Sequence, residues 1–471
     1  MISERMICMA TVEELKKELF YNPKHASDVV EASEVEKADA FAEGYKSFLD
    51  NAKTEREAVE VVVADAKAQG FVEFDPLKKY EAGDKVYYVN RGKSIILAVI
   101  GKKSLLEGVK IAAAHIDSPR LDLKPNPLYE TDELALFKTH YYGGIKKYQW
   151  VAIPLALHGV IVKADGTTVN VKIGEEVGEP KFVISDILPH LGAEQGKRTL
   201  SEGIQGEELN VIVGSRPFKS DEGSELVKLN ILKILNEKYG IVESDFLSAE
   251  LEVVPAFKAD DIGFDRGLIG SYGHDDRVCA YPAEQAIFSI ENPDYTAITV
   301  LTDKEETGSD GNTGLQSSYL VYFINDLAKA NGLDGYQVLS KSECLSADVN
   351  SAYDPTFSSV FEKKNTSFLN RGVVITKYTG ARGKSGTSDA SAEYMGKIRR
   401  MLDKAGVVWQ IGELGKVDAG GGGTVAKYIA NLDVDVVDLG VPVLSMHAPY
   451  EVISKLDVYM AYRAFTEFFK Q

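Results

Sequence analysis

The stretch VKIAAAHID, residues 109–117, decides the fold of this 471-residue chain. It is an apolar run that ends in a histidine and an aspartate, and a second stretch, YTAITVLTDKEETG at 295–308, ends in two glutamates. Short apolar runs of this kind are typical of strands that are buried on both faces of a sheet. In an open α/β sheet the carboxyl ends of the strands meet at one crevice, so these polar residues are expected at a common site.

The chain carries five clusters of acidic residues or histidines, together with a glycine run at Gly420–Gly423. The clusters, in chain order, are His115-Ile-Asp117, Asp275-Asp276-Arg277, Glu305-Glu306-Thr307-Gly308, Ala347-Asp348 and Met446-His447. Each one alone has a plain explanation as a helix cap, a solvated loop or a structural histidine. Together, at comparable strand-end positions, they favour a metal site with a carboxylate base.

The two adjacent glutamates can have different roles. Adjacent side chains on an extended segment point in different directions, so one carboxylate of Glu305-Glu306 can bind metal while the other faces a water molecule. Asp275 can place one oxygen on each of two cations, although an aspartate at a helix start is commonly only a cap. A carboxylate beside His115 can accept from its second ring nitrogen and fix the tautomer.

Strands and helices alternate along much of the sequence, which predicts an α/β fold with a mostly parallel sheet sandwiched by helices. Residues 84–101 predict a hairpin around Asn90-Arg91-Gly92. The middle of the chain is strand-rich and lacks helical periodicity. We therefore predict a β-rich domain over 129–223, inserted into a catalytic domain formed by 1–128 and 224–471.

The bulk properties are those of a globular cytoplasmic protein. The formal charge of −18 argues against nucleic acid and anionic membranes as partners, because both reward clustered Lys and Arg. The three cysteines, Cys8, Cys279 and Cys344, are too scattered for a disulfide framework, which favours a reducing compartment. We expect no signal peptide and no membrane-spanning segment, since no apolar run has the required length.

Two other chemistries find no support in the sequence. A serine hydrolase of the α/β type would need Gly-x-Ser-x-Gly, which the chain lacks. Gly383-Lys384-Ser385 is similar to the end of a phosphate loop, but Tyr378 stands where that motif needs its first glycine. The glycine run at 420–423 precedes a predicted helix, where it could bind an anion or allow close packing.

Five segments, HIDSPRLDLKP, GHDDRVCAY, DKEETGSDG, SADVNSAYDP and SMHAPYE, resemble the M18 family of metalloaminopeptidases, the aspartyl aminopeptidase family. The similarity is greatest to bacterial members and extends over nearly the whole chain. It implies an exopeptidase that removes N-terminal residues from peptides with two zinc ions, for which cobalt or manganese can substitute. It also implies a homo-oligomer, a tetrahedral dodecamer in which the inserted domain makes subunit contacts.

The resemblance also implies roles for individual residues. One zinc would be held by His115, Asp275 and Asp348, and the other by Asp275, Glu306 and His447. Glu305 would be the general base, Asp117 would orient His115, and His190 would assist at the active site of its own or a neighbouring subunit. Lys377, Gly421 and Gly422 match a region that lines the substrate pocket.

The chain departs from the family at Asp354. Members that prefer acidic N-terminal residues carry a substrate-contacting histidine at this place, and a carboxylate there would repel an acidic side chain and favour a basic or neutral one. Two other functions stay open at this point: a related di-metal hydrolase, such as a carboxypeptidase or deacylase, and a catalytically silent scaffold of the same fold.

Overall fold

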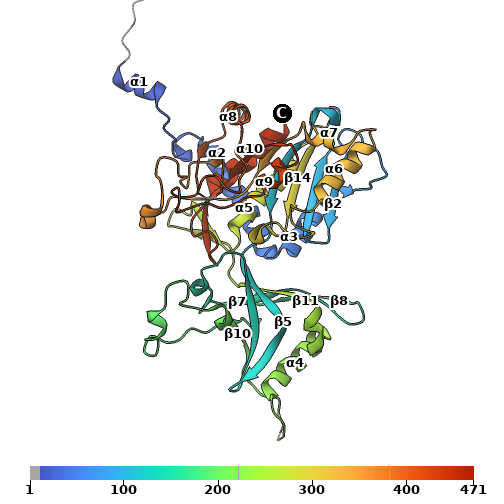
Figure 1. The fold of residues 1–471 in the computed structure, drawn as a ribbon, viewed down its shortest axis with the longest axis vertical. Helices are drawn as coiled ribbons and strands as arrows, with labels where there is room; N and C mark the ends of the chain where they lie inside the picture. Colours follow the sequence, from blue (N-terminus) through green and yellow to red (C-terminus); the bar gives the residue numbers. More distant parts are fainter. Residues whose placement is uncertain (1–10, 221, 381) are drawn as a thin grey trace, which may run out of the picture.

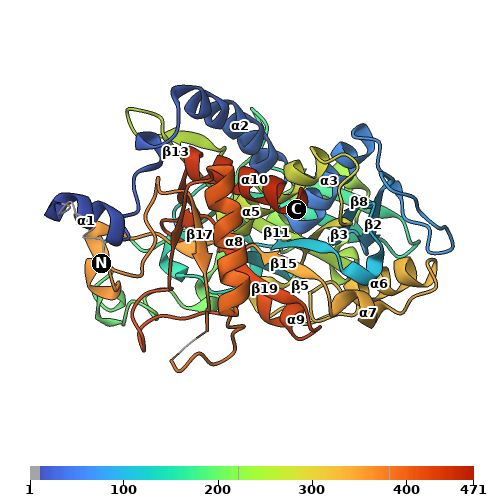
Figure 2. The same cartoon turned by 90° about the horizontal axis from the view of Figure 1, so that it is seen from above.

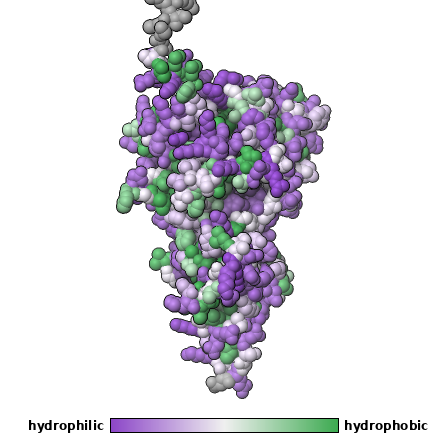
Figure 3. Space-filling model, turned by 60° about the vertical axis from the view of Figure 1, so that its left-hand side comes forward, coloured by the Kyte–Doolittle hydropathy of each residue, from purple (hydrophilic) through white to green (hydrophobic). Residues whose placement is uncertain are grey.

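The computed structural model describes residues 11–220, 222–380 and 382–471. The described chain forms two parts, each built around its own large sheet (Figure 1). The surface is mostly hydrophilic, and the molecule narrows between the broad part and the tapering one (Figure 3). Among the described helices, none combines the length and the apolar character needed to cross a membrane.

The broad part contains a nine-stranded sheet. Its strands, in spatial order, are β1 (Val72–Glu73), β2 (Lys85–Asn90), β3 (Ser94–Val99), β14 (Ala297–Thr302), β4 (Lys110–His115), β15 (Glu343–Ser346), β19 (Asp435–Gly440), β17 (Val373–Thr376) and β18 (Trp409–Ile411). The four central strands, from β14 to β19, run parallel. Strand β3 is antiparallel to both of its neighbours, and β17 is antiparallel to β19. The sheet is therefore mixed: five of its eight neighbouring pairs are parallel, in line with the expected mostly parallel sheet, and three are antiparallel, which was not expected.

The predicted hairpin explains part of this difference. Arg91 and Gly92 both have positive φ angles, 55° and 68°, which a tight turn between β2 and β3 requires. That turn reverses the chain and makes β3 antiparallel to β2. The α/β character of the fold is confirmed.

Helices cover both faces of the nine-stranded sheet (Figure 2). One face packs against α2 (Ala32–Asn51), α3 (Glu55–Ala68), α5 (His274–Phe288), α8 (Ala392–Ala405) and α10 (Lys455–Phe469). The other packs against α6 (Tyr319–Lys329), α7 (Gly335–Leu339) and α9 (Ala426–Ala430). Along β3, Ile95 and Leu97 face the first helix layer while Ile96 and Ala98 face the second, so the strand is apolar throughout.

The tapering part contains a seven-stranded antiparallel sheet. Its strands, in spatial order, are β8 (Thr168–Ile173), β7 (Leu155–Val162), β11 (Ala249–Pro255), β5 (Arg120–Thr131), β6 (Leu134–Tyr142), β10 (Asn210–Gly214) and β9 (Val183–Ile184). Helix α4 (Leu226–Tyr239) packs on β6, and Trp150 lies in a separate core. This sheet reaches beyond residues 129–223 at both ends, and our division into domains stays a prediction.

Smaller elements complete the described chain. Strands β12 (Asp260–Ile262), β13 (Leu268–Ser271) and β21 (Glu451–Ser454) form a three-stranded sheet, and β16 (Asn350–Ser351) pairs with β20 (Pro442–Val443). Helix α1 (Val12–Leu19) begins with a capping box formed by Thr11 and Glu14, has no buried residue and stands away from the body (Figure 1).

Candidate metal centre

Three of the five polar clusters meet at one edge of the nine-stranded sheet. Strand β4 ends at His115, which lies opposite Thr302, the last residue of the parallel strand β14. The short helix η7 (Glu305–Thr307) follows β14, and Asp348 follows β15 on the other side of β4. The parallel register therefore brings these side chains to the same crevice, as the sequence predicts.

The other two clusters come from outside this sheet. Asp275 lies in the first turn of α5, and His447 lies in the loop between β20 and β21. The Asp275 carboxylate is placed between the two imidazoles: Oδ1 lies 3.1 Å from His115 Nε2, and Oδ2 lies 3.2 Å from His447 Nε2. One aspartate is thus positioned to serve two adjacent cation sites.

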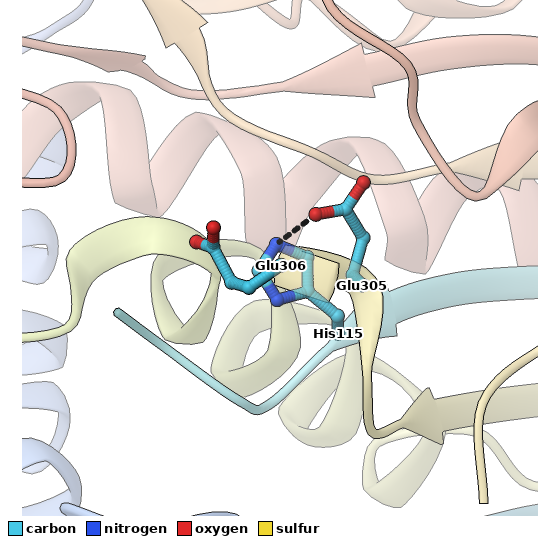
Figure 4. A group of neighbouring side chains, drawn as sticks. All are labelled: His115, Glu305 and Glu306. Atoms are coloured by element: carbon cyan, nitrogen blue, oxygen red, sulfur yellow. Dashed lines mark ion pairs between the residues drawn. The ribbon is translucent and has the colours of Figure 1, made fainter. Parts of the chain in front are cut away.

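Three groups of side chains each offer ligand atoms within 4.8 Å of one another. They are His115 with Asp275 and Asp348, Asp275 with Glu306 and His447, and His115 with Glu305 and Glu306. The first two are the ligand sets that the family resemblance implies. The third includes Glu305, whose Oε2 lies 3.8 Å from His115 Nε2 (Figure 4).

The two glutamates differ in direction and exposure. Their carboxylates extend to different sides of the His115 ring (Figure 4). The side chain of Glu305 is 18% exposed, whereas that of Glu306 is 3% exposed. This difference fits one glutamate that faces the cavity and one that lies deeper, beside His447.

Asp117 connects the first histidine to the paired glutamates. His115 Nδ1 lies 3.0 Å from the backbone oxygen of Asp117 and 3.3 Å from its Oδ1. The same carboxylate accepts from the backbone N–H groups of Glu305 and Glu306, at 3.1 and 3.2 Å. Asp117 therefore fixes both the imidazole and the loop that follows β14.

Sequence reasoning missed a second buried support, Glu451. Its carboxylate accepts from the backbone N–H of His447 at 2.7 Å and from that of Asp275 at 3.1 Å. Glu451 stands four residues after His447, in the quoted segment SMHAPYE, but a single glutamate in a strand gives no local signal of this role. His447 Nδ1 lies 2.8 Å from the backbone oxygen of Gly144.

The electrostatics of the centre favour added positive charge. Burial, and then repulsion from Asp117 and Asp275, raise the pKa of Glu305 to about 7. Burial would lower the pKa of His447, but its hydrogen bond to Asp275 and the charge of Glu306 raise it to about 10. Raised pKa values for both the acids and the histidines are expected where carboxylates outnumber cations.

A cavity of about 380 Å³ opens beside these side chains. Its wall includes Gly144, Asp275, Glu305, Glu306, Asp348–Asn350, Thr376, Thr379, Leu414, Gly421–Thr424, Asp438, Met446 and His447. Gly421 and Gly422 therefore lie where a pocket wall was expected. At Gly420 a Cβ would come within 1.9 Å of the Leu414 backbone oxygen, which favours close packing as the reason for a glycine there.

Three predicted residues lie elsewhere. His190 is exposed on a turn of the tapering part, and Asp354 uses its carboxylate to accept from the Thr356 N–H at 2.8 Å. Lys377 forms an ion pair with Asp389, while the preceding residue, Thr376, faces the cavity. None of the three is in the cavity wall of the described chain, so their roles toward substrate stay predictions.

The residues at the centre fit a bound divalent metal ion. Imidazole nitrogen and carboxylate oxygen are the ligands that zinc takes in sites with an open position. Glu306 Oε1 is buried and has no hydrogen-bond partner within residues 11–220, 222–380 and 382–471, and such an orphaned oxygen is suited to a cation. Both histidines direct Nε2 at Asp275 and use Nδ1 for a backbone oxygen.

Comparisons with known proteins agree with the metal-binding character of this centre. A protein from Clostridium acetobutylicum named probable M18 family aminopeptidase 1 is 50% identical over 462 residues, or 96% of this chain and 99% of the relative. A crystal structure of an M18 aminopeptidase from Thermotoga maritima superposes with a TM-score of 0.91 at 44% identity, covering 96% of this chain and all of that one. A structure of the mApe1 dodecamer from S. cerevisiae shares the fold with a TM-score of 0.75 at 20% identity, over 93% of this chain and 97% of that one.

The family profile extends this similarity to almost the whole sequence. The profile described as aminopeptidase I zinc metalloprotease (M18) matches residues 48–469, a range that includes every residue of the centre. The chain belongs to the M18 family of zinc metallopeptidases.

Proposed function

We propose that the chain is a zinc-dependent aminopeptidase whose centre holds two metal ions and removes single residues from the N-termini of peptides. The observation that carries the proposal is the position of Asp275, with one carboxylate oxygen near each histidine and with Glu305 beside them. The family match supports a metal-dependent exopeptidase, and the two ligand sets support the number of ions.

The proposed ligands are His115, Asp275 and Asp348 for one ion, and Asp275, Glu306 and His447 for the other. When bound, the ions would supply Lewis-acid polarisation of the scissile carbonyl and lower the pKa of a water molecule. Zinc is proposed on the family match, with cobalt or manganese as substitutes.

Glu305 is the proposed general base. Its carboxylate is the more exposed of the pair, and Asp117 fixes its backbone N–H. In the proposed reaction Glu305 takes a proton from the attacking water as the new C–O bond forms, and it then hands that proton to the amine nitrogen as the peptide C–N bond breaks. Asp117 keeps His115 in one tautomer throughout.

The cavity favours neutral or basic N-terminal residues. Among the described residues its wall includes no lysine or arginine, so an acidic side chain would find no ammonium or guanidinium partner there. Asp438 adds a further carboxylate to the wall, and burial raises its pKa to about 7. The Asp354 carboxylate accepts from the Thr356 N–H at the start of a short helix and is not part of this wall.

We also propose that the chain forms a homo-oligomer. Exposed apolar side chains, Leu188 at 50% and Leu191 at 68%, flank His190 on the tapering part. Such side chains are suited to a subunit contact, through which His190 would reach a neighbouring active site and stabilise the oxyanion. A dodecamer is what the mApe1 relative forms, and for this chain that number and a cytoplasmic location stay predictions.

A substrate panel tests the activity against the two alternatives. Purified protein with zinc, cobalt or manganese would be given aminoacyl chromogenic substrates, N-blocked peptides and C-terminally varied peptides. We expect release of free N-terminal residues and no cleavage of the N-blocked peptides. Cleavage from the C-terminus would favour a carboxypeptidase, and release of the acyl group from N-blocked substrates would favour a deacylase. An absence of turnover at full metal occupancy would favour a catalytically silent scaffold.

Glu305→Gln tests the base. The substitution removes the proton acceptor and keeps the shape, so we expect unchanged metal content and a kcat lower by ~10²–10⁴-fold. Asp310→Asn, an exposed change on the same loop, is the matched control and should keep wild-type kcat. Near wild-type kcat for Glu305→Gln at full metal occupancy would show that another group takes the proton.

A further inference from the structure

The end of strand β6 reaches from the seven-stranded sheet into the metal centre. Tyr142, the last residue of β6, is buried, and its hydroxyl donates to Asp117 Oδ2 at 2.7 Å. Two residues later, the backbone oxygen of Gly144 lies 2.8 Å from His447 Nδ1. Tyr142 therefore touches the support of His115, and Gly144 touches His447 directly.

Asp117 depends on Tyr142 for its fourth donor. Its Oδ1 faces His115 Nδ1 and the Glu305 N–H, while Oδ2 accepts from the Glu306 N–H and from the Tyr142 hydroxyl. With both oxygens occupied, the carboxylate has one orientation. Removal of the hydroxyl would leave Oδ2 with a single donor and free the carboxylate to rotate.

Tyr142 is itself held firmly. The Arg120 guanidinium lies 3.9 Å from the centre of the tyrosine ring, and Arg120 pairs with Glu55 and Glu252, both buried. Burial raises the pKa of Tyr142, so its hydroxyl keeps the proton that it donates. The hydroxyl is therefore a rigid, permanent donor.

The two glycines let the backbone approach this closely. Gly143 has a φ of +74°, and a Cβ on it would lie 3.2 Å from Glu306 Oε2. A Cβ on Gly144 would lie 3.4 Å from His447 Nδ1. The segment 142–144 thus lies beside Glu306 and His447 and reaches His115 through Asp117, but it contributes no proposed ligand itself.

We propose that residues 142–144 are the positioning element of the metal centre, in which Tyr142 holds Asp117, and through it His115 and the paired glutamates, while Gly144 holds His447. This inference rests on the proposed function. It gives the seven-stranded sheet a part in metal binding in addition to any part in assembly. Tyr142 is a positioning residue, since it acts through Asp117.

Tyr142→Phe tests the element in the full-length holoenzyme, because it deletes one oxygen and keeps the ring over Arg120. Zinc retention would be measured by titration with a competing chelator, and kcat and KM by steady-state hydrolysis. We expect apparent zinc affinity and kcat to fall by about 10–100-fold with KM nearly unchanged. Tyr141→Phe, the neighbouring residue at 41% exposure, should match the wild type in all three.

A double-mutant cycle separates positioning from a general loss of stability. If Tyr142 acts through Asp117, then Tyr142→Phe should have little further effect on zinc affinity in an Asp117→Asn background. Wild-type zinc retention and kcat for Tyr142→Phe, or effects that add fully to those of Asp117→Asn, would overturn the inference. Failure of the wild type to bind zinc or release N-terminal residues would instead overturn the proposed function.

Discussion

Lys53 joins the two parts of the molecule, and its replacement should destabilise their contact strongly. Lys53 lies between α2 and α3, and its side chain is 2% exposed. The ammonium lies 2.8 Å from Glu175, which follows β8, and donates to the backbone oxygens of Pro255 and Phe257 at 2.7 and 2.6 Å. One buried cation thus satisfies three acceptors of the tapering part.

The expected magnitude follows from this burial. Removing one partner of a buried ion pair costs about 3–5 kcal/mol, because the other charge stays buried and unpaired. His158 Nε2, 3.3 Å from Glu175, remains as a partial partner, so Lys53→Met should lie near the lower end of that range. Lys258 also faces Glu175, at 3.3 Å, but is 47% exposed, and Lys258→Met should cost only about 0–1 kcal/mol.

Urea unfolding followed by tryptophan fluorescence measures both variants. Trp150 lies in the core of the tapering part and Trp409 in β18, so each part has one reporter. With an m-value of about 3 kcal/mol/M, a loss of about 3 kcal/mol moves the midpoint by about 1 M. In Lys53→Met, the unfolding transition reported by Trp150 should shift more than the one reported by Trp409.

A second variant isolates the unpaired charge. In Lys53→Met with Glu175→Gln no carboxylate is left unpaired, so part of the lost stability should return. Equal midpoints for Lys53→Met and Lys258→Met would refute the argument, because burial would then make no difference. No recovery in the double variant would refute the assignment of the loss to Glu175.

Three further changes probe the centre and the core. His447→Ala removes a proposed ligand, so metal analysis should find one of the two ions lost or weakly held. Glu284 is fully buried, and burial raises the pKa of its carboxyl group. The stability contributed by the bound proton is therefore complete below the ordinary glutamate pKa of about 4.3. It is lost as the pH rises through the raised pKa of the folded state. The melting temperature of Glu284→Gln should therefore fall less than that of the wild type as the pH is raised above the ordinary glutamate pKa. Gly420→Ala puts a Cβ within 1.9 Å of the Leu414 backbone oxygen, and the displaced cavity wall should lower kcat/KM by up to about 100-fold with metal content unchanged.

Each of these changes has a matched control. His140→Ala, on an exposed histidine, should leave metal content unchanged, and equal content in both histidine variants would exclude His447 as a ligand. Glu291→Gln, on an exposed glutamate, should follow the wild-type pH profile, and parallel curves for all three proteins would contradict the Glu284 argument. In Gly383→Ala the added Cβ meets no atom within 4 Å, so this variant should keep the wild-type kcat/KM. If Gly420→Ala also kept the wild-type kcat/KM, the packing role of Gly420 would be disproved.

Local signals in the sequence predict that His115, Glu305 and Asp348 lie together. Apolar runs end at His115 and just before Glu305 and Asp348, and parallel register then brings those ends together. The turn at Arg91-Gly92 is equally local, and it is confirmed. Patterns of this kind need no knowledge of distant pairing.

What the sequence missed depends on register and on distant contacts. Lys377 and Thr376 are neighbours, and a shift of one residue at a strand end exchanges the side chain that faces the cavity. Tyr142 meets Asp117 only because β6 pairs with β5, which no local pattern specifies.

The proposed ligands are spread over most of the chain, from His115 to His447, and this spacing has a consequence for the timing of activity. Asp275 sits between two histidines that are far apart in sequence, and such non-local contacts form late because long loops must close first. A nascent or partly folded chain therefore lacks a complete centre. The order of folding would itself keep an incompletely folded chain from cleaving peptides, without a separate inhibitor.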